Sequence, residues 1–491
     1  MSLLRHLSRN IRQNTGPGQW TRHRPFTSSS SQPRRRAGAV VAVSLAVAGS
    51  TLALANRRKV QCDHDVEEDP VDAFPARFQK PRWTLAQYLS ADQILAGGPS
   101  WWPVGAGIDR CDALTVASNY ESEDYIAVYF GAKDDVDHKT YIGLFDGHNG
   151  SATSEFLSEH LITFLQRSLA RLPQEYDDLL RSDPSHEDDL IQDTIKYVFR
   201  EIDQAIVDPS DVFTSSSKTN AVRTLRQAYS GSCALVSLYD PDNKSLRVAL
   251  AGDSRAVLGR KVKGKDGKET YAVHVLSVDQ NGYNPAEVAR LNAEHPGEKV
   301  VEKGRVMGWG MSRAFGNAAY KWTVETQKKL NERYLGDRPR DTMKTPPYLT
   351  AEPVVTNFTV QPGDFLIMGS DGLWDCLTNE EAVGLVGVWL KQNGHAVPNP
   401  EKDDKKKVED SKIYKPVDLP VTLSQTDKTA FYPYWRAEKR FVNSDNNVAA
   451  HLVRNAFGGA DSDLTEALLS LTAPRSRRYR DDISVVVTFF S

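Results

Sequence analysis

The chain has 491 residues and a formal net charge of −3, and charged residues make up 25% of it. This mildly acidic balance argues against a protein that binds nucleic acid. The four cysteines (Cys62, Cys111, Cys233 and Cys376) follow no CxxC or Cys–His spacing, which disfavours a zinc site or a disulfide framework and favours buried free thiols.

The first 60 residues differ from the rest, because they contain eleven Lys or Arg residues and no Asp or Glu. An Arg-rich and Ser-rich segment without acids is typical of a mitochondrial transit peptide. The alternative, a basic arm that binds nucleic acid, is disfavoured by the acidic balance of the remaining chain. We therefore predict that residues 1–60 are a mitochondrial targeting segment.

Within that segment, residues 37–55 are uncharged and mostly Ala, Val and Leu. As a helix, these 19 positions would be about 28 Å long, just enough to cross a hydrocarbon core. Arginines flank both ends, so the charge pattern predicts no orientation. The stretch is compatible with a single inner-membrane anchor or with a sorting signal.

The remaining chain has the length of one large domain. We expect residues 61–107 to be an acidic linker and leading segment, and residues 108–491 to form the main domain. Residues 395–446 are polar, with several prolines and a run of lysines, and predict a surface insertion.

A short apolar run, Tyr141–Phe145, predicts a buried strand that leads directly into Asp146, Gly147 and His148. A rigid strand that ends in an acid, a glycine and an imidazole can position catalytic side chains at the edge of a sheet. An ordinary strand-to-helix turn is the alternative, since Asp and Gly are common turn residues. Upstream, the acids Glu123 and Asp124 precede an alternating strand at residues 125–130.

The following segments predict helices and strands by their hydrophobic spacing. Apolar residues at helical intervals predict amphipathic helices over 156–169 and 191–202, and a hairpin is expected from 233–239 and 246–251. Asn284, Pro285 and Glu287 are a helix start, and Thr378 with Glu381 forms a capping box. Apolar strands are expected at 365–368 and 483–490.

Five aspartates share one feature, because each lies at the boundary of a predicted strand: Asp124, Asp146, Asp253, Asp371 and Asp481. Clustered carboxylates repel one another unless cations neutralise them. An all-oxygen ligand set selects Mg²⁺ or Mn²⁺ over Zn²⁺. Two such ions can activate a water and hold a phosphoryl group for in-line displacement, and His148 could then protonate the leaving oxygen.

Four of these motifs, in this order, resemble those of the metal-dependent Ser/Thr protein phosphatases of type 2C. The motifs are Phe145-Asp146-Gly147-His148-Asn149-Gly150, Gly252-Asp253-Ser254-Arg255-Ala256-Val257-Leu258-Gly259, Ser370-Asp371-Gly372-Leu373-Trp374-Asp375 and Arg480-Asp481-Asp482-Ile483. Longer strings, such as Asn284–Leu291 and Thr345–Pro353, resemble the mitochondrial pyruvate dehydrogenase phosphatases within that family. The resemblance runs from about residue 108 to the C-terminus, excluding the insertion.

The resemblance implies an α+β fold, in which a central sandwich of two antiparallel β-sheets is flanked by α-helices and the metals lie at one end. It implies that Asp146 bridges two metal ions and that Gly147 offers its carbonyl to one of them. The remaining implied metal residues are Asp371 and Asp481 at the first ion, Glu123 and Asp124 at the second, and Asp253 and Asp375 at a third, weaker position. His148 matches the proposed general acid.

Three positions depart from the family pattern. Leu250 stands where the family often has a polar Asn, a change that we expect to affect only local packing. Asn119 stands where most members have an arginine that contacts the substrate phosphate, and we keep it as the candidate substrate-binding residue. Asn317 stands where an aspartate is usual, which removes an acid near the site.

The resemblance implies hydrolysis of phosphoserine on a mitochondrial phosphoprotein, with the E1α subunit of pyruvate dehydrogenase as the expected substrate. Either the matrix or the intermembrane space is compatible with the sequence. Two alternatives remain open: a catalytically impaired member that serves as an adaptor or scaffold, and a two-metal hydrolase of small phosphoesters. Retention of every metal-facing acid disfavours the first, and the longer strings disfavour the second.

Overall fold

A computed structural model describes residues 89–131, 138–176, 182–183, 186–264, 267–393, 411–423 and 426–491. The predicted targeting segment, its candidate anchor at 37–55 and most of the predicted linker lie outside the described residues. Within the described ranges, no helix is both long and apolar enough to cross a membrane.

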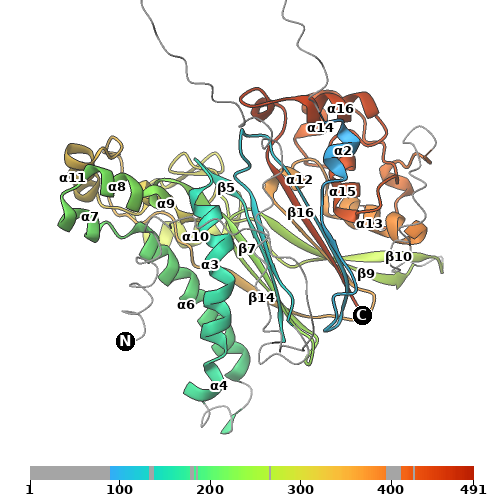
Figure 1. The fold of residues 1–491 in the computed structure, drawn as a ribbon, viewed down its shortest axis with the longest axis horizontal. Coiled ribbons are helices and arrows are strands. Elements are labelled where there is room, and N and C mark those ends of the chain that lie inside the picture. The colour runs from blue at the N-terminus through green and yellow to red at the C-terminus, as the bar shows by residue number, and fades with distance from the viewer. Residues whose placement is uncertain are drawn as a thin grey trace, which may run out of the picture.

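Two antiparallel sheets form the centre of the molecule (Figure 1). The larger has the strand order β1-β2-β16-β15-β9-β10, and the smaller has the order β14-β8-β7-β4-β3. The strands of the larger sheet are β1 (Ser100–Trp101), β2 (Ile108–Val116), β16 (Ile483–Phe490), β15 (Phe365–Gly369), β9 (Arg255–Lys263) and β10 (Glu269–Val275). Those of the smaller sheet are β14 (Val354–Thr359), β8 (Ser245–Ala251), β7 (Ala234–Asp240), β4 (Thr140–Phe145) and β3 (Tyr125–Tyr129).

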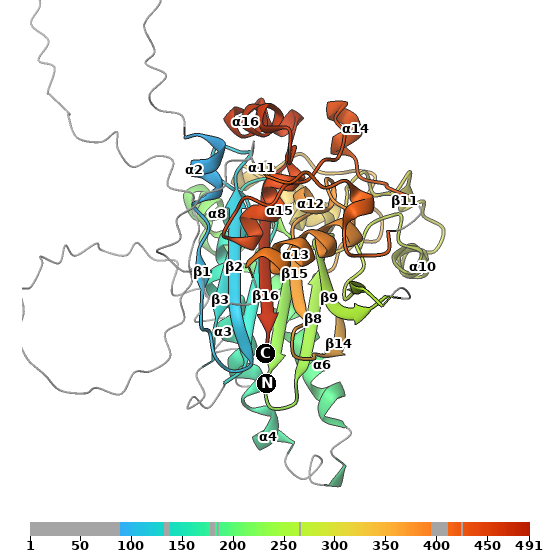
Figure 2. The ribbon, with the colours of Figure 1, turned by 90° about the vertical axis from the view of Figure 1, so that its right-hand side faces the viewer.

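Helices cover the outer face of each sheet. On the smaller sheet lie α3 (Ala152–Leu169) and α6 (Glu187–Val207), and on the larger sheet lie α13 (Asn379–Asn393) and α15 (Val448–Ala456). Figure 2 shows α13 and α15 in front of the strands of the larger sheet. The predicted α+β sandwich with helices outside is therefore confirmed.

Shorter elements complete the fold. The helices are α2 (Ala91–Leu95), α4 (Leu172–Glu175), α7 (Ser210–Ser215), α8 (Lys218–Thr224), α9 (Arg226–Tyr229), α10 (Pro285–Glu294), α11 (Val324–Tyr334), α12 (Asp371–Trp374), α14 (Phe431–Trp435) and α16 (Ser462–Ser470), with 3₁₀ turns η2 (Ala318–Tyr320), η4 (Pro416–Asp418) and η5 (Ser476–Arg478). The short strands are β5 (Gly147–His148), β6 (Gly231–Ser232), β11 (Val301–Glu302), β12 (Arg305–Val306) and β13 (Phe315–Gly316).

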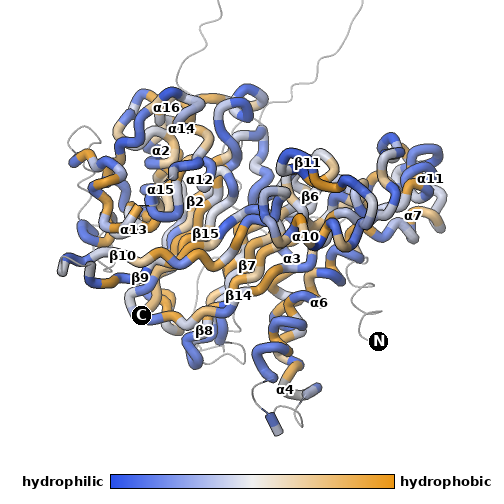
Figure 3. Tube along the Cα trace, turned by 180° about the vertical axis from the view of Figure 1, so that it is seen from behind, coloured by the Kyte–Doolittle hydropathy of each residue, from blue (hydrophilic) through white to orange (hydrophobic). Residues whose placement is uncertain are grey.

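The hydrophobic core lies in three layers. Between the sheets, side chains such as Ile142, Leu258 and Val486 pack together. The outer faces of the sheets pack against α3 and α6 on one side and against α13 and α15 on the other. Figure 3 shows the strands largely in the hydrophobic colour and many outer loops in the hydrophilic one. Strands that are apolar on both faces are expected where a sheet is covered on both sides.

Part of the predicted surface insertion enters the core instead. Leu419, Tyr432 and Phe441 are at most 5% exposed, and the backbone N–H of Tyr271 in β10 donates to Pro420. The polar composition of the segment as a whole predicts a surface position. Its few aromatic and aliphatic residues nevertheless bury apolar surface that docks residues 411–423 and 426–446 on the larger sheet.

Candidate metal centre and active site

Strand register brings the predicted acids to one end of the sandwich. In the smaller sheet, Tyr125 pairs with Phe145 and Ala234 pairs with Ala251, so the residues just before β3, after β4 and after β8 lie at the same end. The chain then crosses to the larger sheet through Gly252, Asp253 and Ser254. There Gly369 pairs with both Arg255 and Val485, which places the end of β15 beside the starts of β9 and β16.

Asp146 lies at the centre of this cluster. Burial raises its pKa well above the usual range, and the charges of Asp371, Asp124 and Asp253 raise it further. The backbone N–H of Asp371 lies 3.5 Å from a carboxylate oxygen of Asp146. The structure therefore brings together acids that are more than 200 residues apart in the chain.

Gly147 allows a close approach between two parts of the cluster. A Cβ atom there would lie 2.2 Å from the carbonyl oxygen of Glu123 and 2.5 Å from Oγ of Ser154. The Ser154 hydroxyl donates to that same Glu123 carbonyl at 2.5 Å. Only glycine fits between them, so this position holds β5 against the loop that carries Glu123.

The loop of Glu123 is organised by Asp482, a residue of the last sequence motif for which the sequence predicts no role. Its buried carboxylate accepts hydrogen bonds from the backbone N–H groups of Ser118 (2.5 Å), Asn119 (3.1 Å) and Glu123 (2.7 Å). The side-chain amide of Asn119 donates to Glu123 at 2.7 Å and to Asp482 at 3.3 Å. The amide of Asn119 thus holds the acidic loop, and its contact with substrate stays a prediction.

Asp124 is almost fully buried, and its Oδ2 atom has no hydrogen-bond partner among the described residues. Burial, followed by the charge of Asp482, raises its pKa to about 8. An unpaired oxygen in a group of buried acids is costly unless a cation approaches it. The donor set of carboxylate oxygens fits a hard divalent cation such as Mg²⁺ or Mn²⁺.

The predicted third position contains a thiol as well as acids. Ligand atoms of Asp146, Cys233 and Asp253 all lie within 4.8 Å of one another, and the Cys233 thiol donates to Asp253 at 3.2 Å. Burial raises the pKa of Asp253 to about 6. Asp375 follows α12 directly, close enough for its charge to add to burial in raising the pKa of both Asp253 and Asp371. Cys233 is a buried free thiol, as predicted.

Asp481 lies at the rim of the cluster and forms an ion pair with Arg477. The positive charge of Arg477 also lowers the pKa values of Glu123, Asp124 and Asp371 against the raising effect of burial. Asp481 is therefore linked to the other predicted metal residues through this arginine.

His148 lies beside the cluster and is held by Asn317. Its Nε2 atom is 2.7 Å from Oδ1 of Asn317, and because an amide oxygen only accepts, Nε2 carries the proton. The Nδ1 atom is buried without a partner among the described residues, and the ring lies 5.3 Å from that of Trp309. Burial lowers the pKa of His148 to about 4.

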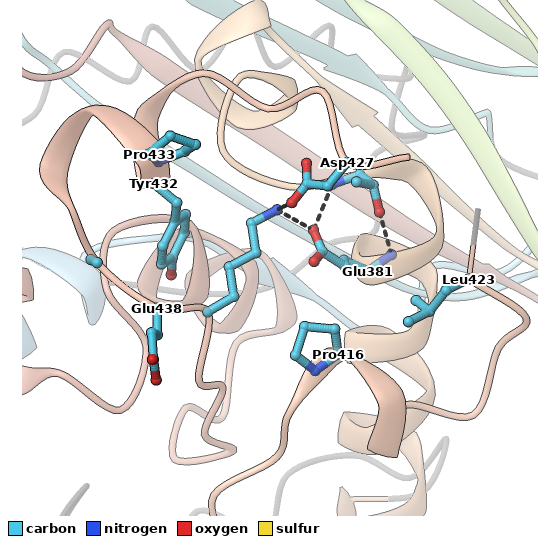
Figure 4. Close-up of a pocket in the computed structure, with 10 residues that line it drawn as sticks. Glu381, Pro416, Leu423, Asp427, Tyr432, Pro433 and Glu438 are labelled. Carbon is cyan, nitrogen blue, oxygen red and sulfur yellow. Dashed lines mark hydrogen bonds and ion pairs between the residues drawn. The ribbon is translucent and has the colours of Figure 1, made fainter. Parts of the chain in front are cut away.

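A separate cavity of about 400 Å³ lies where residues 411–423 and 426–441 meet the start of α13. Figure 4 shows the Glu381 and Asp427 carboxylates near each other in this cavity. The ammonium group of Lys439 pairs with both, at 2.6 and 2.8 Å. The residues that line the cavity include none of the predicted site residues, so the carboxylate cluster remains the candidate site.

Comparisons with known proteins found a matching family, similar sequences and a similar solved structure. The sequence profile of the protein phosphatase 2C family matches residues 116–413. A protein phosphatase 2C homolog of Schizosaccharomyces pombe is 39% identical over 390 residues, which cover 78% of this chain and 81% of that protein. The mitochondrial pyruvate dehydrogenase (acetyl-transferring) phosphatase 1 of Saccharomyces cerevisiae is 37% identical over 417 residues, which cover 79% of this chain and 69% of that protein. The solved serine-threonine phosphatase 2C of Toxoplasma gondii is 17% identical in sequence. Its match covers 80% of this chain and 97% of the Toxoplasma chain, with a TM-score of 0.46.

Proposed function

Because the chain belongs to the protein phosphatase 2C family, whose members are metal-dependent Ser/Thr phosphatases, we propose that it removes phosphate from a phosphoserine of a mitochondrial protein. The proposed substrate is the E1α subunit of pyruvate dehydrogenase. The similarity to the yeast pyruvate dehydrogenase phosphatase supports this choice, and the acid-free N-terminus supports a mitochondrial location.

The observation that carries the proposal is the gathering of acids from distant strand ends at Asp146. Asp146, Asp371 and Asp481 would hold one Mg²⁺ or Mn²⁺ ion, with Gly147 lending its carbonyl. Asp146, Glu123 and Asp124 would hold the second, and Asp253 with Asp375 would hold a weaker third. When bound, such ions supply activation of a water nucleophile and electrostatic stabilisation of the phosphoryl group.

The protein's own side chains prepare the site for that chemistry. Asp482 fixes the loop that presents Glu123 and Asp124, and Asn317 holds the ring of His148. We propose that Nδ1 of His148 protonates the leaving serine oxygen. The dianionic phosphate of the substrate would favour the charged imidazolium that this role requires.

The proposal is tested by comparing phosphate release from a phosphoserine peptide and from a nucleotide, with Mn²⁺ and with a chelator. We expect metal-dependent turnover of the peptide and little turnover of the nucleotide. Equal rates on both would favour a hydrolase of small phosphoesters. Absence of turnover on either, with the protein folded and Mn²⁺ saturating, would favour the adaptor.

A further inference from the structure

The arginines near the acidic cluster differ in whether their N–H donors already have hydrogen-bond partners. Arg255 donates two hydrogen bonds to Asp279, at 2.9 and 2.6 Å, and its guanidinium stacks over Trp374. Arg480 is buried, with its guanidinium bonded to backbone carbonyls. Both therefore have structural partners that occupy their donors.

Arg477 differs, because its side chain is 38% exposed and forms an ion pair with Asp481. A guanidinium has five N–H donors, so an ion pair with one carboxylate leaves donors for a second anion. Arg477 is also the cation whose charge reaches Glu123, Asp124 and Asp371. It is therefore a partly accessible positive charge at the mouth of the proposed metal centre.

The turn that carries Arg477 is anchored on both sides. The buried Ser476 hydroxyl donates to the carbonyl of Ser118, and Arg480 donates to the carbonyl of Ala117 at 2.7 Å. Both contacts are made to the two residues that follow β2, where the acidic loop begins. The backbone of Arg477 is thus fixed relative to that loop, and less entropy is lost when its side chain binds an anion.

We propose that Arg477 binds the phosphate group of the substrate, an inference that rests on the proposed phosphatase function. A planar guanidinium matches a phosphate with two parallel hydrogen bonds, which a lysine ammonium cannot form. The amide of Asn119 carries no charge, and it already donates to Glu123 and Asp482. Arg477 would keep its contact with Asp481 while its remaining donors hold the phosphate.

The test compares Arg477→Ala, Arg477→Gln and Arg477→Lys with Arg478→Ala in the full chain. Arg478 is the matched control, because it is an exposed arginine on the same turn. Inorganic phosphate is the probe, measured by calorimetry in the presence of Mg²⁺ and as a competitive inhibitor of phosphoserine-peptide hydrolysis. We expect phosphate affinity to fall roughly tenfold or more in the Ala and Gln variants, less in the Lys variant, and under about twofold in the control.

A separate measurement of Mg²⁺ affinity distinguishes two roles of Arg477: binding of phosphate, and positioning of the proposed metal ligand Asp481. Unchanged phosphate affinity in Arg477→Ala would overturn the proposal, as would an equal loss in Arg478→Ala. A weaker Mg²⁺ affinity that alone accounts for the phosphate effect would also overturn it. The Gln variant serves as the test if the Ala variant does not fold. The calorimetric arm needs no turnover, so failure of the phosphatase proposal is seen separately, as an inactive unmodified protein.

Discussion

His148 combines a hydrogen-bonded Nε2 with a buried, unpaired Nδ1, and this arrangement makes its proposed role testable. A serine alkoxide is a poor leaving group, and general acids typically contribute roughly 10²–10⁴-fold to such steps. The phenolate of p-nitrophenyl phosphate leaves with far less help. We therefore expect His148→Ala to lose much more kcat on a phosphoserine peptide than on p-nitrophenyl phosphate.

Both substrates should be assayed across Mn²⁺ concentrations. If His148 only positions Asp146, the two substrates should lose rate equally, and more metal should restore it. That result would remove His148 from the proposed mechanism.

Asp482 is the side chain whose loss should disturb the site without removing a predicted metal ligand. In Asp482→Ala, the N–H groups of Ser118, Asn119 and Glu123 lose a shared acceptor. We expect the free energy of unfolding to fall by at least about 2 kcal/mol and the Mn²⁺ concentration for half-maximal activity to rise. Asp482→Asn keeps one acceptor oxygen and should be milder. Denaturant unfolding and Mn²⁺ titration check both effects. If Asp482→Ala kept the wild-type free energy of unfolding and the wild-type Mn²⁺ requirement, this role would be refuted.

At the scale of elements, the sequence predicts the helices, strands and helix caps that depend on residues close together in the chain. The amphipathic patterns correspond to α3 and α6, the hairpin to β7 and β8, and the final strand to β16. The Asn284 side chain caps α10, and Thr378 and Glu381 exchange the two predicted capping hydrogen bonds. These features depend on residues a few positions apart, so the sequence contains the whole interaction.

Within α15, His451 predicts a pH dependence of stability. Burial lowers its pKa to about 4; Nε2 lies 3.1 Å from the Leu385 carbonyl, and Nδ1 faces the side-chain amide of Asn455. Nearby Asp445 and Arg454 pair with each other. The unfolded chain, with a pKa near 6.5, binds the proton more readily, so stability is lost as the pH falls below that value.

The expected loss attributable to His451 between pH 7 and pH 5 is about 2 kcal/mol. Denaturant unfolding at both pH values should show this difference between the unmodified protein and His451→Gln, which carries no titrating ring. Identical pH dependence in the two proteins would contradict the assignment.

At the scale of the whole molecule, the sequence predicted the strand-end acids but not the contacts that organise them. Asp482 meets Ser118 across 364 positions, and no local pattern marks such a pair. Cys233 was predicted as an ordinary buried thiol, yet strand register places it beside Asp146 and Asp253. Arg477 was one of several arginines before the last strand, and only the folded turn distinguishes it from Arg478.

The prediction for the N-terminal segment concerns residues 1–60, which lie outside the described residues. The acid-free segment should direct import into mitochondria and be at least partly removed there. A chain that begins at Gln61 should remain outside mitochondria in fractionated cells, while the full chain is imported. Import of the shortened chain would show that the targeting signal lies outside residues 1–60.

The most direct test of the whole account is the release of phosphate from phosphorylated pyruvate dehydrogenase by the purified protein, with and without Mn²⁺. Asp146→Asn is the decisive variant, because it keeps the shape of the side chain and removes the charge at the centre of the acidic cluster. We predict phosphate release by the unmodified protein only with metal, and none by a folded Asp146→Asn variant. Near wild-type release by that variant at saturating Mn²⁺ would contradict the two-metal account.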